Sequence, residues 1–352
     1  MQIEELLFRV ENGLTIEGQN FTGLDATSRT LEEGKFVNCV FDNAVFDDCH
    51  FSECTFIKCV FKNASFVRCS FDTSVFMRCT VPLCVFNDCS FQSTSFMTSD
   101  LKQASFERCD MTGCNMINSS LDKVSFAESG MERCALLENT FDEIGLAGSG
   151  WYRSTFTKAD LRASDLTGVE FEQVLFANSN LSHKDLSGRK FKSNTVSDSE
   201  LAGVRFQGAD IDHSLFVNCN LETANFEGAN APYSMFAGSN ITEAQFTQAR
   251  LTNAVFANAV AARASFVDAE LQMGVFDSAD CTEARFDRAK LQYADFTHAD
   301  CRSGGFMEAG FDLTRFHGTN TDGINEHGAT GSKVPTDQDR LLAEVYTPDK
   351  VQ

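Results

Sequence analysis

The sequence contains no long apolar run and few positive charges. No stretch approaches the roughly 20 apolar residues that a membrane-spanning helix needs, so we expect no membrane association. Lysine and arginine number 29 against 50 acidic residues, which gives a net charge of −21, and no basic patch is present. Direct binding to nucleic acid by neutralisation of phosphates is therefore not expected. The acidic start, Met1–Glu5, lacks the basic region of a signal peptide, which predicts a cytoplasmic protein.

The sequence also lacks a recognisable motif for catalysis or ligand binding. Its six histidines are scattered along the chain. The glycine-rich segment 145–150 has the residue order of neither a P-loop nor a dinucleotide-binding turn. The 14 cysteines never form Cys-x-x-Cys, a spacing typical of zinc sites. We therefore expect no enzymatic activity, no cofactor and no metal.

What the sequence does contain is an apolar residue at every fifth position, without a slip, from Phe36 to Phe316. Of the 34 phenylalanines, only Phe8 lies outside this register. A period of five matches neither the 3.6 of a helix nor the 2 of a strand. It fits a coil with four sides of five residues, in which each side points one large residue inward and equivalent positions stack every twenty residues.

A second inward position, two residues before the large one, is filled mostly by cysteine or alanine. All 14 cysteines fall on the two inward positions, with Cys281 and Cys301 at the large one. We interpret them as small buried hydrophobic residues, and unpaired buried thiols favour a reducing cytoplasm. The alternative is soft-metal or oxidative chemistry in one stack of four: Cys49, Cys69, Cys89 and Cys109.

Several five-residue units, among them Ala159–Ala163, Ala224–Gly228 and Ala294–His298, resemble the repeats of the pentapeptide-repeat family. The resemblance covers residues 31–320 and implies that family's all-β fold, a right-handed quadrilateral β-helix. Coils of such a solenoid stack about 4.8 Å apart, and none buries its side chains without neighbours. His298 and His317 would then lie on adjacent coils, where we expect ordinary surface histidines.

The chain divides into five predicted segments. Residues 1–30 are expected to form a β-hairpin cap, because Leu6, Phe8 and Val10 alternate before an Asn12-Gly13 turn. Residues 31–138 form a Cys-rich array and residues 201–320 an Ala-rich array. Residues 321–352 are expected to be a linker and a short helix, which opens with a capping-box pattern at Thr336.

The remaining segment, residues 139–200, is expected to be an irregular β-helix or a break. Lys184 and Arg189 occupy the small inward position there, and a charge cannot lie unpaired in so narrow a core. Whether residues 181–200 form a loop or a regular coil stays open.

Two stripes of large apolar residues occupy outward positions. The first comprises Val37, Ile57, Met77, Met97, Ile117 and Leu137. The second comprises Tyr233, Met273, Tyr293 and Leu313, with Asn253 interrupting. Apolar surface of this extent is typical of an interface, although outward β-branched residues also favour strand structure. The second stripe could receive the C-terminal helix or another subunit.

A different side of the coil is expected to be an acidic face. Its members are Asp42, Asp100, Asp122, Asp142, Glu143 and Asp160, diluted by nearby lysines and arginines. Such a side either keeps the protein soluble or imitates a polyanion.

These features favour a rigid, non-enzymatic scaffold for protein–protein interaction, with a protein partner of unknown identity or a second copy of the chain in a homodimer. The family resemblance implies an alternative. Some pentapeptide-repeat relatives resemble duplex DNA in width and charge, and they protect or block type II topoisomerases such as gyrase. A DNA mimic that binds such a DNA-binding enzyme is therefore the second hypothesis. An effector or accessory protein of a secretion system is the third.

Overall fold

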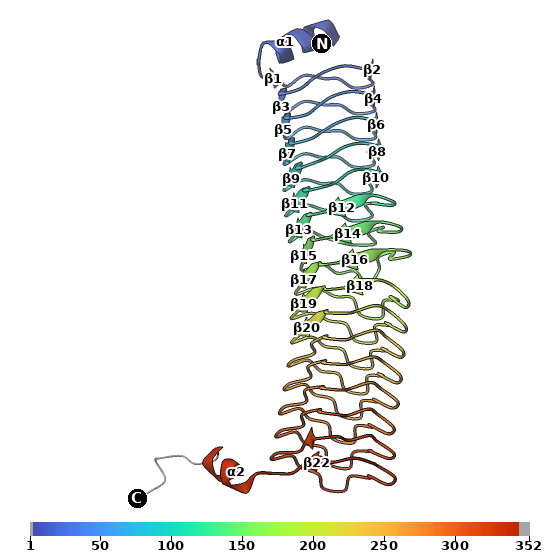
Figure 1. The fold of residues 1–352 in the computed structure, drawn as a ribbon. Coiled ribbons are helices and arrows are strands. Elements are labelled where there is room, and N and C mark those ends of the chain that lie inside the picture. Colours follow the sequence, from blue (N-terminus) through green and yellow to red (C-terminus); the bar gives the residue numbers. More distant parts are fainter. Residues whose placement is uncertain (1–2, 345–352) are drawn as a thin grey trace, which may run out of the picture. The chain divides into compact units, whose positions relative to one another are not determined.

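The computed structural model describes residues 3–344 and divides the chain into two units, Met1–Asn180 and Leu181–Gln352. Both units are built from the same element, a coil of a right-handed, four-sided parallel β-helix. Within each unit, a coil pairs in register with the coil twenty residues further along, as Phe36 does with Phe56. The fold predicted from the five-residue period is confirmed (Figure 1).

Most strands of the first unit are three residues long. One sheet contains β1 (Ile16–Glu17), β3 (Lys35–Val37), β5 (Thr55–Ile57), β7 (Val75–Met77), β9 (Ser95–Met97), β11 (Asn115–Ile117), β13 (Ala135–Leu137), β15 (Thr155–Thr157) and β17 (Leu175–Ala177). A second contains β2 (Asp25–Thr27), β4 (Val45–Asp47), β6 (Ser65–Val67), β8 (Val85–Asn87) and β10 (Ser105–Glu107). A third contains β12 (Gly130–Glu132), β14 (Gly150–Tyr152) and β16 (Glu170–Glu172).

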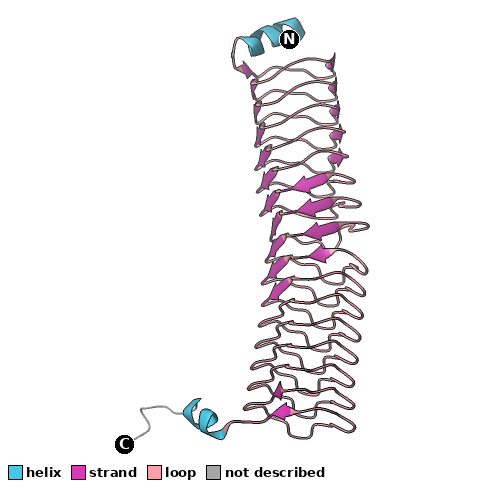
Figure 2. Ribbon diagram, viewed as in Figure 1, coloured by secondary structure: helices cyan, strands magenta, loops and turns pink. Residues whose placement is uncertain are grey.

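The second unit has fewer named strands, and its coils are joined mostly by single β-bridges such as Met235 to Val255 (Figure 2). Its elements are β18 (Phe191–Lys192), β19 (Thr195–Ser197), β20 (Leu215–Val217), β21 (Thr314–Arg315), β22 (Lys333–Val334) and α2 (Gln338–Glu344). The hydrogen-bonding between coils is nevertheless the same in both units. Phe61 N–H donates to Thr80 O at 2.8 Å in the first unit, and Phe246 N–H donates to Ser265 O at 2.7 Å in the second.

Phenylalanine fills the interior of the coils. Rings one coil apart stack, as Phe41 and Phe61 do with centroids 4.8 Å apart and planes 5° apart. Rings on neighbouring sides of the coil meet edge to face, as Phe56 and Phe61 do at 5.4 Å. Both arrangements are favourable for aromatic quadrupoles. The large inward position is therefore the core of each unit.

The expected N-terminal hairpin is wrong, because Ile3–Glu11 form a helix, α1. Leu6 and Val10 are buried while Phe8 is 59% exposed, so the apolar spacing is four residues and not two. The helix ends in a Schellman motif at Gly13, whose φ is 63°. Gly13 N–H donates to Val10 O and Leu14 N–H donates to Arg9 O, both at 2.9 Å. The first coil already begins at β1.

The segment expected to be irregular keeps the register. Residues 181–200 form a regular coil whose large inward residues, Leu181, Leu186, Phe191 and Val196, are fully buried. Lys184 and Arg189 are only half-buried, so a long side chain occupies the small position without enclosing its charged end.

Polar residues at the small position are accommodated by hydrogen bonds. Asn139 Oδ1 accepts the Ser119 N–H at 2.8 Å, and its Nδ2 donates to Met116 O at 2.8 Å. The amide thereby joins two neighbouring coils, so that a buried polar side chain does not break the repeat.

Residues 321–334 also form a coil and not the expected linker. Asn320, Asn325 and Thr330 bridge to the preceding coil, and β22 pairs with β21. At the positions where other coils have a large apolar residue, this coil has Thr321, Glu326 and Gly331. Two are polar and the third has no side chain, so the apolar period could not reveal the coil.

The predicted C-terminal helix is confirmed as α2. Asp337 caps it, because its Oδ1 accepts the Arg340 N–H at 3.1 Å.

Candidate protein-interaction surfaces

The first predicted stripe forms one unbroken column, which we name the apolar ladder. Its residues are Val37, Ile57, Met77, Met97, Ile117 and Leu137, the last residues of β3, β5, β7, β9, β11 and β13. Each is the direct register partner of the next. Glu17 pairs with Val37 at one end and Thr157 with Leu137 at the other, so polar residues bound the ladder.

The middle of the apolar ladder is its most exposed part. Met77 and Met97 are each 36% exposed, while the other four members are half-buried. Strand propensity accounts for the β-branched Val37, Ile57 and Ile117. It does not account for two unbranched methionines at the most exposed positions of the ladder. Methionine is common at adaptable binding surfaces.

The second stripe lies at a corner of the coil and not on a strand. We name it the corner ladder: Tyr233, Met273, Tyr293 and Leu313, which are 52–54% exposed. All four have positive φ, between 49° and 61°, a conformation that favours glycine and asparagine. Neither burial nor backbone conformation explains large apolar residues here.

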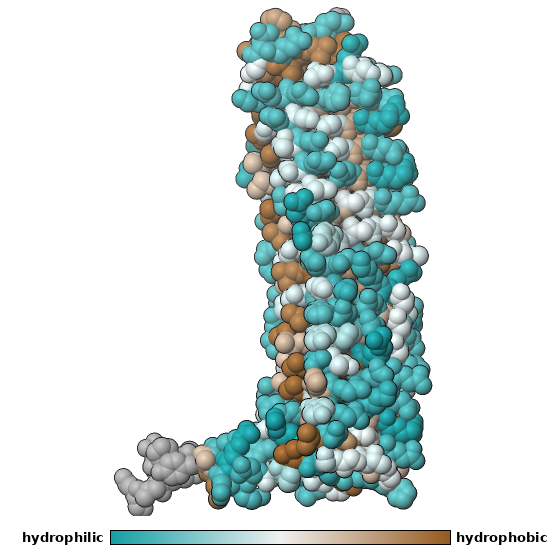
Figure 3. Space-filling view, viewed as in Figure 1, coloured by the Kyte–Doolittle hydropathy of each residue, from teal (hydrophilic) through white to brown (hydrophobic). Residues whose placement is uncertain are grey.

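Further ring and apolar side chains lie close to Tyr233 of the corner ladder. The His213 ring stacks on Tyr233 with centroids 4.8 Å apart. Two residues further along the coil lies a half-buried apolar column, whose members are bridged in register: Leu215, Met235, Val255 and Val275. Figure 3 shows hydrophobic residues gathered in a band on the face in view.

The described part of α2 does not cover the corner ladder. Its contacts go to His298 and His317, while Tyr293 and Leu313 remain more than half exposed. Of the two occupants considered for this stripe, the C-terminal helix is therefore not the one observed among residues 3–344.

The predicted acidic residues do not form one continuous face. Asp122, Asp142 and Asp160 line a shallow surface hollow together with Arg162. Asp42 lies four coils before Asp122 in the same column, where its Oδ1 accepts the Lys62 N–H at 3.0 Å.

Most of these carboxylates already have partners. Asp122 lies 3.5 Å from Lys102, Glu143 lies 3.2 Å from Lys123, and Asp160 lies 2.7 Å from Arg162. Asp100 accepts the Lys102 N–H at 3.2 Å. Partial burial opposes the charged form of Asp122, but hydrogen bonds from Thr140, the Asp142 N–H and Ser120 outweigh it and lower the pKa of that carboxyl. Much of the acidic surface is thus neutralised or engaged within the fold.

The cysteines are buried and unpaired. Burial raises the pKa of Cys54 and Cys84 to about 12, so these thiols stay protonated and unreactive near neutral pH. Their sulfurs donate to main-chain carbonyls of the preceding coil, as Cys84 does to Phe61 O at 2.6 Å. This is the environment of a structural cysteine.

One group of titratable side chains does gather among the described residues. His298, His317 and Glu344 place a nitrogen or oxygen ligand atom each within 4.8 Å of one another. Sequence reasoning anticipated that the two histidines would lie on adjacent coils but treated both as surface residues. His317 is instead almost fully buried, and the contribution of Glu344 could not be read from the repeat.

Comparison with known proteins places these surfaces on a recognised fold. The family model described as pentapeptide repeats matches residues 31–76, 84–129, 154–191, 199–232, 239–272 and 275–300, more than half of the chain. No curated protein matches the chain. No helix among residues 3–344 is long and apolar enough to cross a bilayer.

Solved structures that resemble the chain include three proteins of the same repeat. One is a trypsin-treated variant of QnrB1, a plasmid-mediated fluoroquinolone resistance protein, with 18% identity over 54% of this chain and 94% of that chain and a TM-score of 0.29. HetL, involved in heterocyst differentiation regulation in the cyanobacterium Nostoc, has 14% identity over 94% of both chains and a TM-score of 0.19. Rfr23 of the cyanobacterium Cyanothece has 14% identity over 39% of this chain and 94% of that chain and a TM-score of 0.23.

At these identities the resemblance concerns the fold and not what those proteins do. The repeat register, the four-sided coil and the match of the family model over most of the sequence agree with one another. The chain therefore belongs to the pentapeptide-repeat family.

Proposed function

We propose that this protein is a non-enzymatic scaffold that binds a protein partner through its apolar ladder, with the corner ladder as a second contact surface. The observation that carries the proposal is the pair Met77 and Met97, which are direct register partners, the most exposed members of the ladder, and unnecessary to the core. Pentapeptide-repeat proteins are generally scaffolds without catalysis.

The size of the ladder limits the kind of partner. Five steps of about 4.8 Å and three-residue strands about 10 Å long give an area of roughly 240 Å². A stable interface buries about 800 Å² on each partner. Full burial of the six side chains would contribute at most about 10 kcal/mol, and association offsets much of it. The ladder alone therefore favours a partner that also contacts neighbouring surface over a stable homodimer built on this stripe only.

Charge density disfavours the alternative of a DNA mimic. Duplex DNA carries one negative charge per ~1.7 Å, or about three per ~4.8 Å coil. This chain carries −21 over about 16 turns, little more than one per turn. Cross-coil ion pairs, such as Arg108 with Asp88 and Arg263 with Glu243, dilute the field further. A DNA-binding enzyme such as a type II topoisomerase is thus the second choice of partner, and no residue favours a secretion-system role.

The test is a charge placed in the middle of the ladder. The double variant Met77→Glu with Met97→Glu should lose the bound partner in a pull-down while circular dichroism remains that of the parent protein, because both side chains lie outside the core. Binding by the parent protein should survive 1 M salt, at which the screening length falls to about 3 Å, since apolar contacts are not screened.

Two controls separate the proposal from mimicry. The variant Asn63→Glu with Gln103→Glu adds the same charge on another side of the coil and should bind normally. The variant Asp42→Lys with Asp122→Lys removes acidic charge. Should the ladder variant keep every partner while the acidic-face variant loses one, the DNA-mimic function would replace the scaffold.

A further inference from the structure

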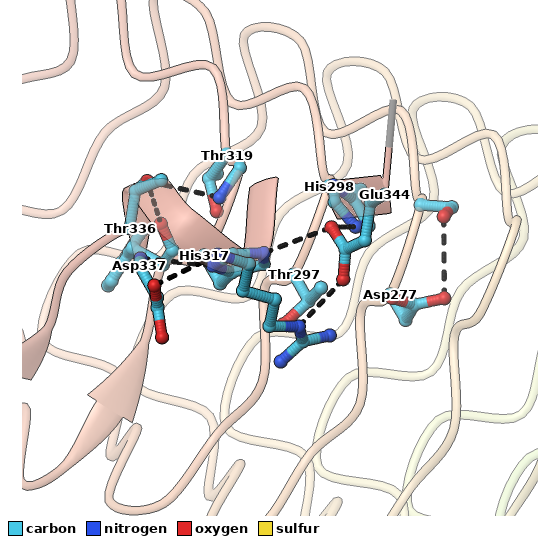
Figure 4. A network of polar contacts seen from close by, with 12 residues as sticks. Asp277, Thr297, His298, His317, Thr319, Thr336, Asp337 and Glu344 are labelled. Atoms are coloured by element: carbon cyan, nitrogen blue, oxygen red, sulfur yellow. Dashed lines mark hydrogen bonds and ion pairs between the residues drawn. The ribbon is translucent and has the colours of Figure 1, made fainter. Parts of the chain in front are cut away.

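Two histidines of consecutive coils share one carboxylate of the C-terminal helix (Figure 4). The Nε2 atoms of His298 and His317 each lie 3.1 Å from Oε2 of Glu344. The second oxygen of that carboxylate, Oε1, accepts from Arg340 Nε at 2.6 Å. The hydrogen bonds from His317, first, and from Arg340 lower the pKa of the Glu344 carboxyl. The carboxylate thus accepts hydrogen bonds from His317 and Arg340 and also contacts His298.

This donor set, two imidazoles and a carboxylate, has the composition of a zinc site, but the main chain argues against one. The Asp337 N–H donates to Nδ1 of His317 at 3.1 Å. A neutral imidazole whose Nδ1 accepts a hydrogen bond carries its proton on Nε2. A metal-bound histidine has the opposite arrangement, with the metal on one nitrogen and a donated N–H on the other. Asp337 therefore makes His317 a hydrogen-bond donor to Glu344.

The rest of the attachment of α2 is also polar. The helix has no fully buried residue: Leu342 is 66% exposed, and Leu341 is half-buried. Before the helix, the Thr336 hydroxyl accepts the Gly318 N–H at 3.1 Å and donates to Phe316 O at 3.2 Å. In the preceding coil the corresponding donor, His298 N–H, bonds to the main chain of the next coil, at His317 O. Thr336 and Asp337 thus replace the hydrogen bonds that a further coil would supply.

We propose that His298, His317 and Glu344 form a polar clasp that holds α2 as a releasable strap against the coil edge at residues 316–318. The clasp closes the hydrogen-bonding edge at residues 316–318, which is the kind of edge that otherwise pairs with another chain. Because the strap leaves no apolar side chain fully buried, and only Leu341 is half-buried, it can open without unfolding the coils beneath it, as weakly packed terminal elements do. Opening frees the Gly318 N–H and the His317 ring for another partner.

Amide hydrogen exchange of the full chain at neutral pH, in the presence of a chelator, tests the clasp. Glu344→Gln removes the charge that His298, His317 and Arg340 share, so exchange at Gly318, Arg340 and Leu341 should quicken about tenfold, while Phe296 and Phe306 stay as protected as before. Asp339→Asn removes the same charge from the same helix, away from the clasp, and should leave those rates near the parent values. Equal rates in the two variants would overturn the proposal.

The protonation state of His317 provides the second readout. Nitrogen-15 spectra of the imidazole should show the Nε2–H tautomer in the parent protein, and added Zn²⁺ should change neither the spectrum nor the exchange rates. If stoichiometric Zn²⁺ converts His317 to the Nδ1–H form and slows exchange in α2, the three residues are a metal site and the clasp is wrong.

Discussion

Phe61 lies face to face with Phe41, with ring centroids 4.8 Å apart and planes 5° apart, inside a coil that leaves Phe61 2% exposed. Phe61→Asp would bury an unpaired carboxylate between such rings, so we expect the first unit not to fold.

Phe61→Leu is the matched control, because Leu121 and Leu161 fill the same column and are fully buried. It should fold with a loss of about 1 kcal/mol. Thermal melts followed by circular dichroism distinguish the two variants, and an Asp variant that melts like the parent protein would mean that position 61 does not point inward.

Asn139 should be replaceable by serine but not by alanine. Asn139→Ala leaves the buried Ser119 N–H and Met116 O without their side-chain partner, which costs about 1–3 kcal/mol. Asn139→Ser should retain most of the stability, because Ser99 at the same position of an earlier coil accepts from Cys79 N–H and donates to Phe76 O. Chemical denaturation of the three proteins gives the comparison. Equal losses for Ala and Ser would show that volume, and not hydrogen bonding, matters at this position.

The thiols should be present but unreactive. Titration of the denatured protein should find 14 free thiols, and the native protein at pH 8 should react slowly, because all 14 are buried away from the reagent. Cys49→Ala should fold with a loss of order 1 kcal/mol. Stoichiometric zinc or several disulfides in freshly prepared protein would contradict the assignment of structural cysteines.

Lys333 should protect the last aromatic layer. Its Nζ lies 5.4 Å and 5.3 Å from the ring centroids of Phe311 and Phe316, which are only 5% and 7% exposed. Lys333→Ala removes both the cation–π contact and the aliphatic cover, at a cost of about 1 kcal/mol.

Hydrogen exchange at the Phe311 and Phe316 amides measures this loss locally. The control Lys62→Ala removes an exposed lysine elsewhere and should change neither rate. Unaltered rates in Lys333→Ala would show that the end of the second unit needs no such cover.

The five-residue period predicted the coil, its core and the alignment of the apolar ladder, because every large inward side chain from Phe36 to Phe316 is apolar and the register admits no slip. It failed where one pattern fits two structures. Leu6 and Val10 match both a strand and a helix, and the helix also gains the Glu5–Arg9 pair four residues apart. In the coil at residues 321–334 the positions of the large apolar residue are taken by Thr321, Glu326 and Gly331, so no apolar signal marks it.

The candidate site was less predictable than the fold. The period predicts which residues share a column. It does not predict the exposed fraction of a side chain, which depends on the conformation that the side chain adopts, as the half-buried Lys184 and Arg189 show. The position of Glu344 beside His298 and His317 depends on how α2 folds back, and no repeat encodes that.

Because coils pair in parallel at an offset of twenty residues, a mutation can add or remove a whole coil without changing how the other coils pair. Val60 pairs with Thr80, and Phe61 N–H donates to Thr80 O, so a gene that lost codons 61–80 would join Val60 to Val81 and restore equivalent neighbours on all four sides. The product would lack one rung of the apolar ladder, with Ile57 beside Met97. Unequal recombination can therefore lengthen or shorten a binding surface of this kind by one side chain at a time. The length of the binding surface can change in evolution without any new amino-acid substitution.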